Sequence, residues 1–191
     1  MLAVGIAIFL WSYFGIRETL PPQVASIPVS EVPLSPNVEV TPAPSPSPEV
    51  PTVLYVTRPE LGDRVGTITL PTLDLSWPIY EGTTDAQLIK GVGHYVQSVL
   101  PGEIDNTVLS GHRTTVFNRL GELKIDDLIL VKTKAGTFTY QVTQIKIVNR
   151  TDRTVIVPTE AATLTITTCY PFDNVGATTK AFIVTADLVS D

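Results

Sequence analysis

Two side chains in this sequence could act as a nucleophile and its proton partner, Cys169 and His112. Cys169 ends a run of β-forming residues at 163–168, and as the only cysteine of the chain it has no partner for an internal disulfide. His112 follows a second apolar, β-like run at 108–111. A thiol and an imidazole at strand ends, far apart in sequence, are the components of a cysteine nucleophile with its general acid–base. A free cysteine is also often a buried hydrophobic residue, so the pattern alone leaves that alternative open.

The elements that must position these two residues are short. From about residue 64, alternating apolar and polar segments are interrupted by Gly, Asp and Pro. They predict a short helix at 85–90, ended by Gly91, and strands at 65–70, 73–80, 107–110, 128–133, 137–149, 154–156, 163–168 and 181–187. Many short strands at close spacing, with little helix, predict an all-β domain that forms a closed or nearly closed β-barrel.

The composition argues against several classes of function. The formal net charge is −6, and the Lys and Arg residues are scattered, whereas a nucleic-acid-binding surface needs a basic stripe. Two histidines and one cysteine cannot build a Cys/His zinc site of the usual kind. The glycine spacing of a phosphate-binding loop is also absent from the sequence. We therefore expect no cofactor, no metal and no nucleic acid partner.

The N-terminus differs from the rest of the chain. Residues 1–16 are almost entirely apolar and stop at Arg17, which is slightly short of the roughly 20 residues that a membrane span needs. We interpret residues 1–17 as a membrane anchor or signal-anchor segment, and a cleaved secretory signal peptide is the competing interpretation. A buried core helix is excluded because a proline-rich stretch follows at once.

Residues 18–63 form a second unit, in which ten of the chain's 16 prolines fall between positions 21 and 51. Proline alternating with Ser and Ala favours extended polyproline II structure, which is typical of a semi-rigid spacer. At about 3.1 Å per residue, such a stalk could hold a domain on the order of 100 Å from a membrane. The sequence thus predicts an anchor, a stalk and a β-barrel domain at residues 64–191.

With these pieces in place, the sequence from about Val65 to Val189 resembles the bacterial sortases, a family of cysteine transpeptidases. The two segments that carry the resemblance most specifically are Leu109-Ser-Gly-His-Arg113 and Thr163-Leu-Thr-Ile-Thr-Thr-Cys169, which are close to the family's histidine and cysteine motifs. The continuation Cys169-Tyr-Pro-Phe172 is most similar to the class D and class E branches. The family fold is an eight-stranded β-barrel, which agrees with the strand pattern.

The resemblance implies a function and an active site. Cys169 would attack the carbonyl of a Thr in a C-terminal Leu-Pro-x-Thr-Gly-like sorting motif of a surface protein, giving a thioester. His112 would protonate the leaving amine and deprotonate the incoming one, which belongs to a peptidoglycan precursor or a pilin. The family also implies a single-pass membrane location with the catalytic domain outside the cell. Two alternatives remain: a catalytically impaired sortase-fold binding module, and a cysteine endopeptidase that releases its product to water.

Further positions complete the expected site. Thr168 and His94 are candidate substrate-binding residues. Sortases carry an arginine on the strand after the cysteine loop, where it is thought to hold substrate and stabilise the oxyanion, and the aligned position here is Ala181. Loss of one oxyanion donor typically lowers the rate by about 10² to 10³. The cationic residues considered as replacements are Lys180, Arg150 and Arg153, although alternation along a strand predicts that Lys180 faces away from the site.

Overall fold

A computed structural model describes residues 53–173 and 176–190. Its strands are β1 (Arg64–Leu70), β2 (Leu75–Glu81), β3 (Val92–His94), β4 (Asp105–Ser110), β5 (Leu128–Thr133), β6 (Thr137–Asn149), β7 (Ala162–Tyr170) and β8 (Lys180–Ser190). The helical elements are the single turn α2 (Asp85–Leu88) and two 3₁₀ turns, η1 (Pro71–Leu73) and η2 (Leu120–Glu122).

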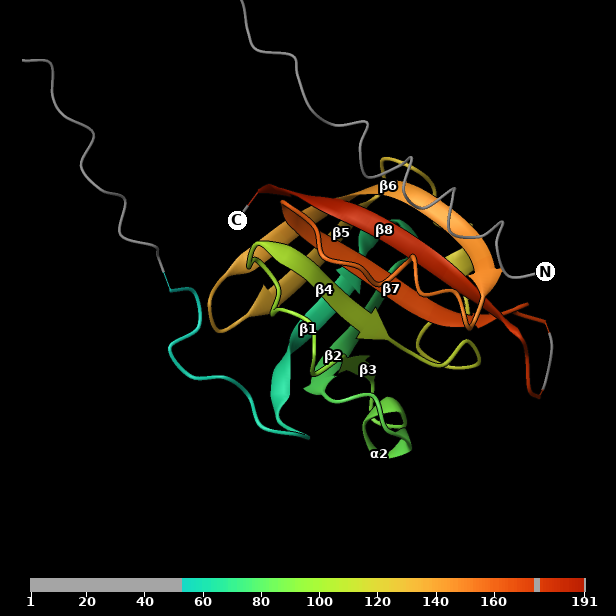
Figure 1. Cartoon of the computed structure of the whole chain (residues 1–191), viewed down its shortest axis with the longest axis horizontal. Coiled ribbons are helices and arrows are strands. Elements are labelled where there is room, and N and C mark those ends of the chain that lie inside the picture. The colour runs from blue at the N-terminus through green and yellow to red at the C-terminus, as the bar shows by residue number, and fades with distance from the viewer. Residues whose placement is uncertain (1–52, 174–175, 191) are drawn as a thin grey trace, which may run out of the picture. The chain divides into compact units, whose positions relative to one another are not determined.

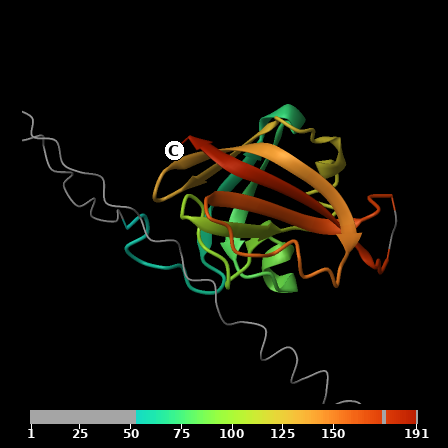
Figure 2. The same ribbon diagram turned by 45° about the horizontal axis from the view of Figure 1, so that its top comes forward.

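The strands close into one barrel in the order β1-β2-β3-β4-β7-β8-β6-β5, and β5 pairs with β1 to complete the ring (Figure 1). Most pairs are antiparallel, but β2 runs parallel to β3 and β4 runs parallel to β7. Figure 2 shows β6 and β8 side by side along one wall. The predicted all-β class and closed eight-stranded barrel are confirmed.

Alternation along β7 and β8 decides which side chains fill the barrel. Leu164 and Ile166 are fully buried in the core and lie opposite Ala186 and Val184 of β8. Successive strand residues point to opposite faces, so Cys169 is on the outer face of the barrel, the face that does not carry these core residues. The β-branched and aliphatic residues of this segment therefore both form the strand and bury its inner face.

One predicted strand is absent from the structure, and one observed strand was not predicted. Residues 154–156 do not form a strand: the connection between β6 and β7 is held to β4 by side chains, with Asn106 Nδ2 donating to Val157 O at 3.0 Å. The eighth strand is instead β3, a three-residue strand with a glycine at its centre. Glycine lowers the β-propensity of this segment, yet it is needed there, because a Cβ on Gly93 would lie 2.4 Å from Gly82 O.

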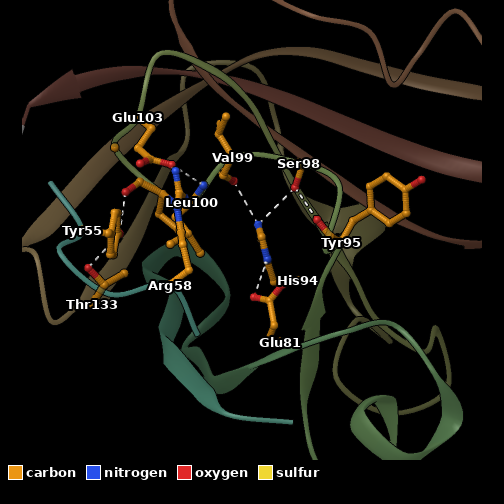
Figure 3. A network of polar contacts seen from close by, with 12 residues as sticks. Tyr55, Arg58, Glu81, His94, Tyr95, Ser98, Val99, Leu100, Glu103 and Thr133 are labelled. Atoms are coloured by element: carbon orange, nitrogen blue, oxygen red, sulfur yellow. Dashed lines mark hydrogen bonds and ion pairs between the residues drawn. The ribbon is translucent and has the colours of Figure 1, made fainter. Parts of the chain in front are cut away.

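The folded unit begins before residue 64, where we placed the domain boundary. Leu54 and Tyr55 pack against the core, and the Tyr55 hydroxyl lies 2.6 Å from Pro101 O. Arg58 forms an ion pair of 2.7 Å with Glu103 (Figure 3). These contacts fix the segment before β1 to the barrel.

The predicted anchor at residues 1–17 and most of the predicted stalk at residues 18–63 lie outside the described residues. Within residues 53–173 and 176–190, no helix has the length and apolar character that a membrane crossing requires.

Candidate active site

Cys169 lies near the carboxyl end of β7, and His112 lies two residues beyond the carboxyl end of the parallel neighbour β4. In the register of β4 and β7, Ser110 is level with Thr167. His112 and Cys169 each follow two residues later, so the register directs both residues to the same end of the two strands. Both residues are partly exposed, which leaves them open to a substrate. A thiol and an imidazole at the same end of the barrel are the components of nucleophilic attack coupled to proton transfer.

The turn that carries His112 is fixed to β7 by two hydrogen bonds. Gly111 N donates to Thr167 O at 3.2 Å, and the Thr168 hydroxyl donates to Gly111 O at 2.7 Å. Residue 111 must be glycine for this turn to close, because a Cβ there would lie 2.5 Å from Val116 Cγ2. The structure thus ties the residue before His112 to the two residues before Cys169.

Thr168, predicted to bind substrate, is only 5% exposed, and its hydroxyl is occupied by the bond to Gly111. It lies opposite Phe182 in the register of β7 and β8, on the core side of the strand. This placement favours a structural role for Thr168 over the substrate contact that we expected.

His94 is also buried, with 1% exposure. Its Nδ1 lies 2.7 Å from Glu81 Oε2, and its Nε2 lies 2.9 Å from Val99 O and 3.1 Å from Ser98 Oγ (Figure 3). Both ring nitrogens are therefore engaged inside the protein, where they join β2, β3 and the segment before β4. The contacts favour a structural role for His94 as well.

Ala181 lies directly opposite Cys169 in the antiparallel pairing of β7 and β8. On its other side, Ala181 is opposite Val148 of β6. Directly opposite residues of antiparallel strands have Cβ atoms about 5 Å apart and share a face of the sheet. The neighbour of the thiol across the sheet is therefore a methyl group.

The comparison with known protein families supports the same conclusion as the two motifs. A family model described as "Sortase domain" matches residues 68–189, which are more than half of the chain. This chain belongs to the sortase family. Sortases are cysteine transpeptidases.

Relatives of this sortase include curated proteins from two species. A protein described as Sortase D of Bacillus subtilis is 43% identical over 128 residues, 66% of this chain and 65% of that protein. Sortase A of Listeria monocytogenes is 29% identical over 128 residues, 65% of this chain and 56% of that protein. The sequence therefore spans less than two thirds of the length of each of these relatives. The first match agrees with the predicted likeness to class D.

Solved sortase structures share the barrel. Sortase A from Corynebacterium diphtheriae superposes with a TM-score of 0.62 at 30% identity, covering 68% of this chain and 62% of that one. Sortase C from Clostridium perfringens SM101 also gives a TM-score of 0.62, at 29% identity, and covers 69% of this chain and 72% of that one.

The cations that we considered as replacements for the arginine of sortases do not lie opposite the thiol. Lys180 pairs with Tyr170 and is exposed. Arg150 is exposed; its backbone N donates to Thr179 O at 2.8 Å, and its guanidinium lies 3.4 Å from Thr178 O. Arg153 is exposed in the connection between β6 and β7.

Arg113, the residue after His112, belongs to the site although the sequence gave no reason to assign it a role. Its side chain is buried, and Nη2 donates to Gly176 O at 2.7 Å, in the chain segment between β7 and β8. Within the same segment, the Phe172 ring packs edge-on against Tyr170 and Phe182. A buried guanidinium beside the catalytic motif could not be recognised locally, because its acceptor lies 63 residues away.

Two cavities flank different parts of the barrel. One of about 830 Å³ is lined by the segment before β1 and by the turn between β5 and β6, away from Cys169. A second, of about 520 Å³, is lined by Asn149, Arg150, Thr151, Thr178 and Thr179, next to the start of β8. Within the described part of the chain, His, Cys, Asp and Glu do not gather in threes that could hold a metal ion.

Proposed function

We propose that this chain is a membrane-anchored sortase-type cysteine transpeptidase whose catalytic pair is Cys169 and His112. The observation that carries the proposal is the parallel pairing of β4 with β7, which sets the two residues at neighbouring strand ends. Family membership supports the same chemistry.

The proposed reaction has two halves. The Cys169 thiolate attacks the carbonyl carbon of a Thr in a Leu-Pro-x-Thr-Gly-like motif, the C–N bond to the next residue breaks, and His112 protonates the departing amine. The thioester carbonyl is then attacked by a second amine, from which His112 removes a proton, and the C–S bond breaks to release the Cys169 thiolate. The substrates are surface proteins with a sorting signal, and the acceptor amine belongs to a peptidoglycan precursor or a pilin.

Location follows from the N-terminal sequence. The apolar run at 1–16 would hold the chain in the cell membrane, and the proline-rich residues that follow would present the barrel outside the cell. Protease treatment of intact cells would remove the barrel domain if this arrangement holds and would leave it intact if the domain is inside.

The test of function uses the purified full chain, peptides with Leu-x-x-Thr-Gly or Leu-x-x-Thr-Ala motifs, and an amine acceptor. Mass spectrometry should detect an acyl adduct on Cys169 and the transferred product, both absent from C169A. An adduct that yields only the hydrolysed peptide, even at high amine concentration, would instead indicate an endopeptidase.

A second candidate function has one observation in its favour. Because Ala181 lies opposite Cys169, the site could bind sorting peptides without processing them, as a sortase-fold binding module. Peptide binding by the folded chain, without an adduct under any condition, would support this candidate and exclude the transpeptidase.

A further inference from the structure

Arg113 is the exception among the cations of this barrel. Of the Lys and Arg residues in the described part of the chain, it alone is buried, with 6% exposure. A guanidinium keeps its charge at any physiological pH, and removing it from water is unfavourable unless strong hydrogen bonds compensate. Burial of this side chain directly after His112 therefore indicates a specific task.

A contact of this side chain reaches the segment that leads into β8. Its Nη2 donates to the carbonyl oxygen of Gly176 at 2.7 Å, which is the short distance typical of a charge-assisted hydrogen bond. Gly176 begins residues 176–179, an arm that leads into β8. Arg113 thus joins the turn that carries His112 to the arm that leads to the partner strand of Cys169.

The far end of this arm is held by other contacts. Thr179 O accepts from Arg150 N at 2.8 Å, and Lys180 N donates to the Thr178 hydroxyl at 3.2 Å. One residue later, Ala181 faces Cys169. The Arg113 contact therefore secures the arm at Gly176, and the contacts of Arg150 and Lys180 secure its other end near β8.

We propose that Arg113 is a positioning residue of the Cys169 site, and that its guanidinium fixes residues 176–179 against the His112 turn to form a wall for the bound peptide. The inference rests on the proposed function, since the peptide is a sorting motif. Ala181 offers a methyl group and no hydrogen-bond donor, so the orientation of the peptide depends on the shape of this wall. A small displacement of a positioning wall can lower a rate by about 10².

The test compares three variants of the full chain. R113M keeps the length of the buried side chain and removes its donors, and R113K keeps the charge with a different geometry. R150M is the matched control, because its guanidinium contact to the same arm is long and exposed and the backbone bond to Thr179 remains. The measurements are transfer kinetics, amide hydrogen exchange of residues 176–190, and the rate of Cys169 alkylation by iodoacetamide.

In R113M we expect kcat/KM for transfer to fall by about tenfold to a hundredfold, mainly through KM, and exchange in the arm to become faster. R113K should be intermediate, and R150M should resemble the parent chain. The rate of Cys169 alkylation should be the same in all variants, because the small reagent iodoacetamide does not have to be oriented by residues 176–179.

Unchanged exchange and unchanged kcat/KM in folded R113M would overturn the proposal. A fall in alkylation as large as the fall in transfer would also overturn it, because Arg113 would then act on the thiol itself. If R113M does not fold, R113K decides by the same criteria. If the parent chain shows no transfer, the proposed function fails, whatever the variants do. Hydrogen exchange then tests the Arg113 contact on its own: slower or unchanged exchange of residues 176–190 in R113M would show that Arg113 does not hold the arm.

Discussion

Cys169 and Ala181 face each other across β7 and β8. The proposed nucleophile thus has a methyl group as its cross-strand neighbour, at the position where the family resemblance leads us to expect an arginine. With Val148 on the far side of Ala181, the surface beside the thiol is small and apolar. This relationship leads directly to the first prediction.

Replacing Ala181 by arginine should raise the transfer activity. A guanidinium about one cross-strand spacing from the thiol could donate to the oxyanion, and one such donor changes rates by about 10² to 10³. The measurement is kcat/KM for peptide transfer by A181R, together with its melting temperature. The control is A181M, which adds bulk without a donor and should give no increase. Equal activities in A181R and A181M would contradict this prediction.

The two histidines should respond to substitution in opposite ways. H112A should fold with an unchanged melting temperature, because His112 is partly exposed, but should lose about 10²- to 10⁴-fold in transfer rate. H94L should be destabilised by about 3 to 5 kcal/mol, because it leaves the Glu81 carboxylate buried without its imidazole partner. Urea unfolding and transfer assays measure the two effects.

A paired variant checks the explanation for His94. Replacing both partners, as in E81L with H94L, removes the isolated carboxylate and should recover part of the lost stability. If H94L alone abolished transfer without loss of stability, His94 would have the substrate or catalytic role that we first expected.

T168V tests the bond that fixes the His112 turn. Valine matches threonine in shape but cannot donate to Gly111 O, so we expect a loss of about 1 kcal/mol in the free energy of unfolding. Because the turn also places His112, kcat/KM should fall by about tenfold. T168S keeps the hydroxyl and should keep most of the activity. Loss of transfer in T168S with retention in T168V would instead point to a methyl contact with substrate.

Tyr140 should make the barrel sensitive to alkaline pH. Burial raises the pKa of Tyr140 to about 12, and its hydroxyl accepts a hydrogen bond from Gly102 N. Between about pH 10 and 12, the folded chain keeps the proton that the unfolded chain has released, so stability falls as pH rises through this window, by about 2 kcal/mol. In urea unfolding, the free energy of unfolding of Y140F should fall less between about pH 9 and about pH 11 than that of the parent chain. Burial also raises the pKa of Tyr55 in the same direction, so a smaller alkaline loss should remain in Y140F.

Much of this protein was predictable from local patterns. The alternation of apolar and polar residues in β6 and β7 predicted those strands, because each strand has one face in the core and its side chains repeat every two residues. The motifs around His112 and Cys169 indicated the catalytic pair and the family, because both are continuous in sequence. The family resemblance also indicated that Ala181 stands where sortases carry an arginine, although only the structure shows that it lies opposite Cys169.

The surroundings of Thr168, His94 and Arg113 depend on contacts between residues that are distant in the sequence, and only the tertiary structure shows them. The sequence does not show that the Thr168 hydroxyl is directed to Gly111, or that both nitrogens of His94 are engaged by Glu81, Val99 and Ser98. It also does not show that Arg113 is buried and reaches Gly176. A side chain's burial and its hydrogen-bond partner are set by whichever elements the barrel closure places beside it. That is why periodicity predicted most of the strands and the motifs suggested the pair of Cys169 and His112, whereas only the closed barrel shows which surrounding side chains are buried and what they contact.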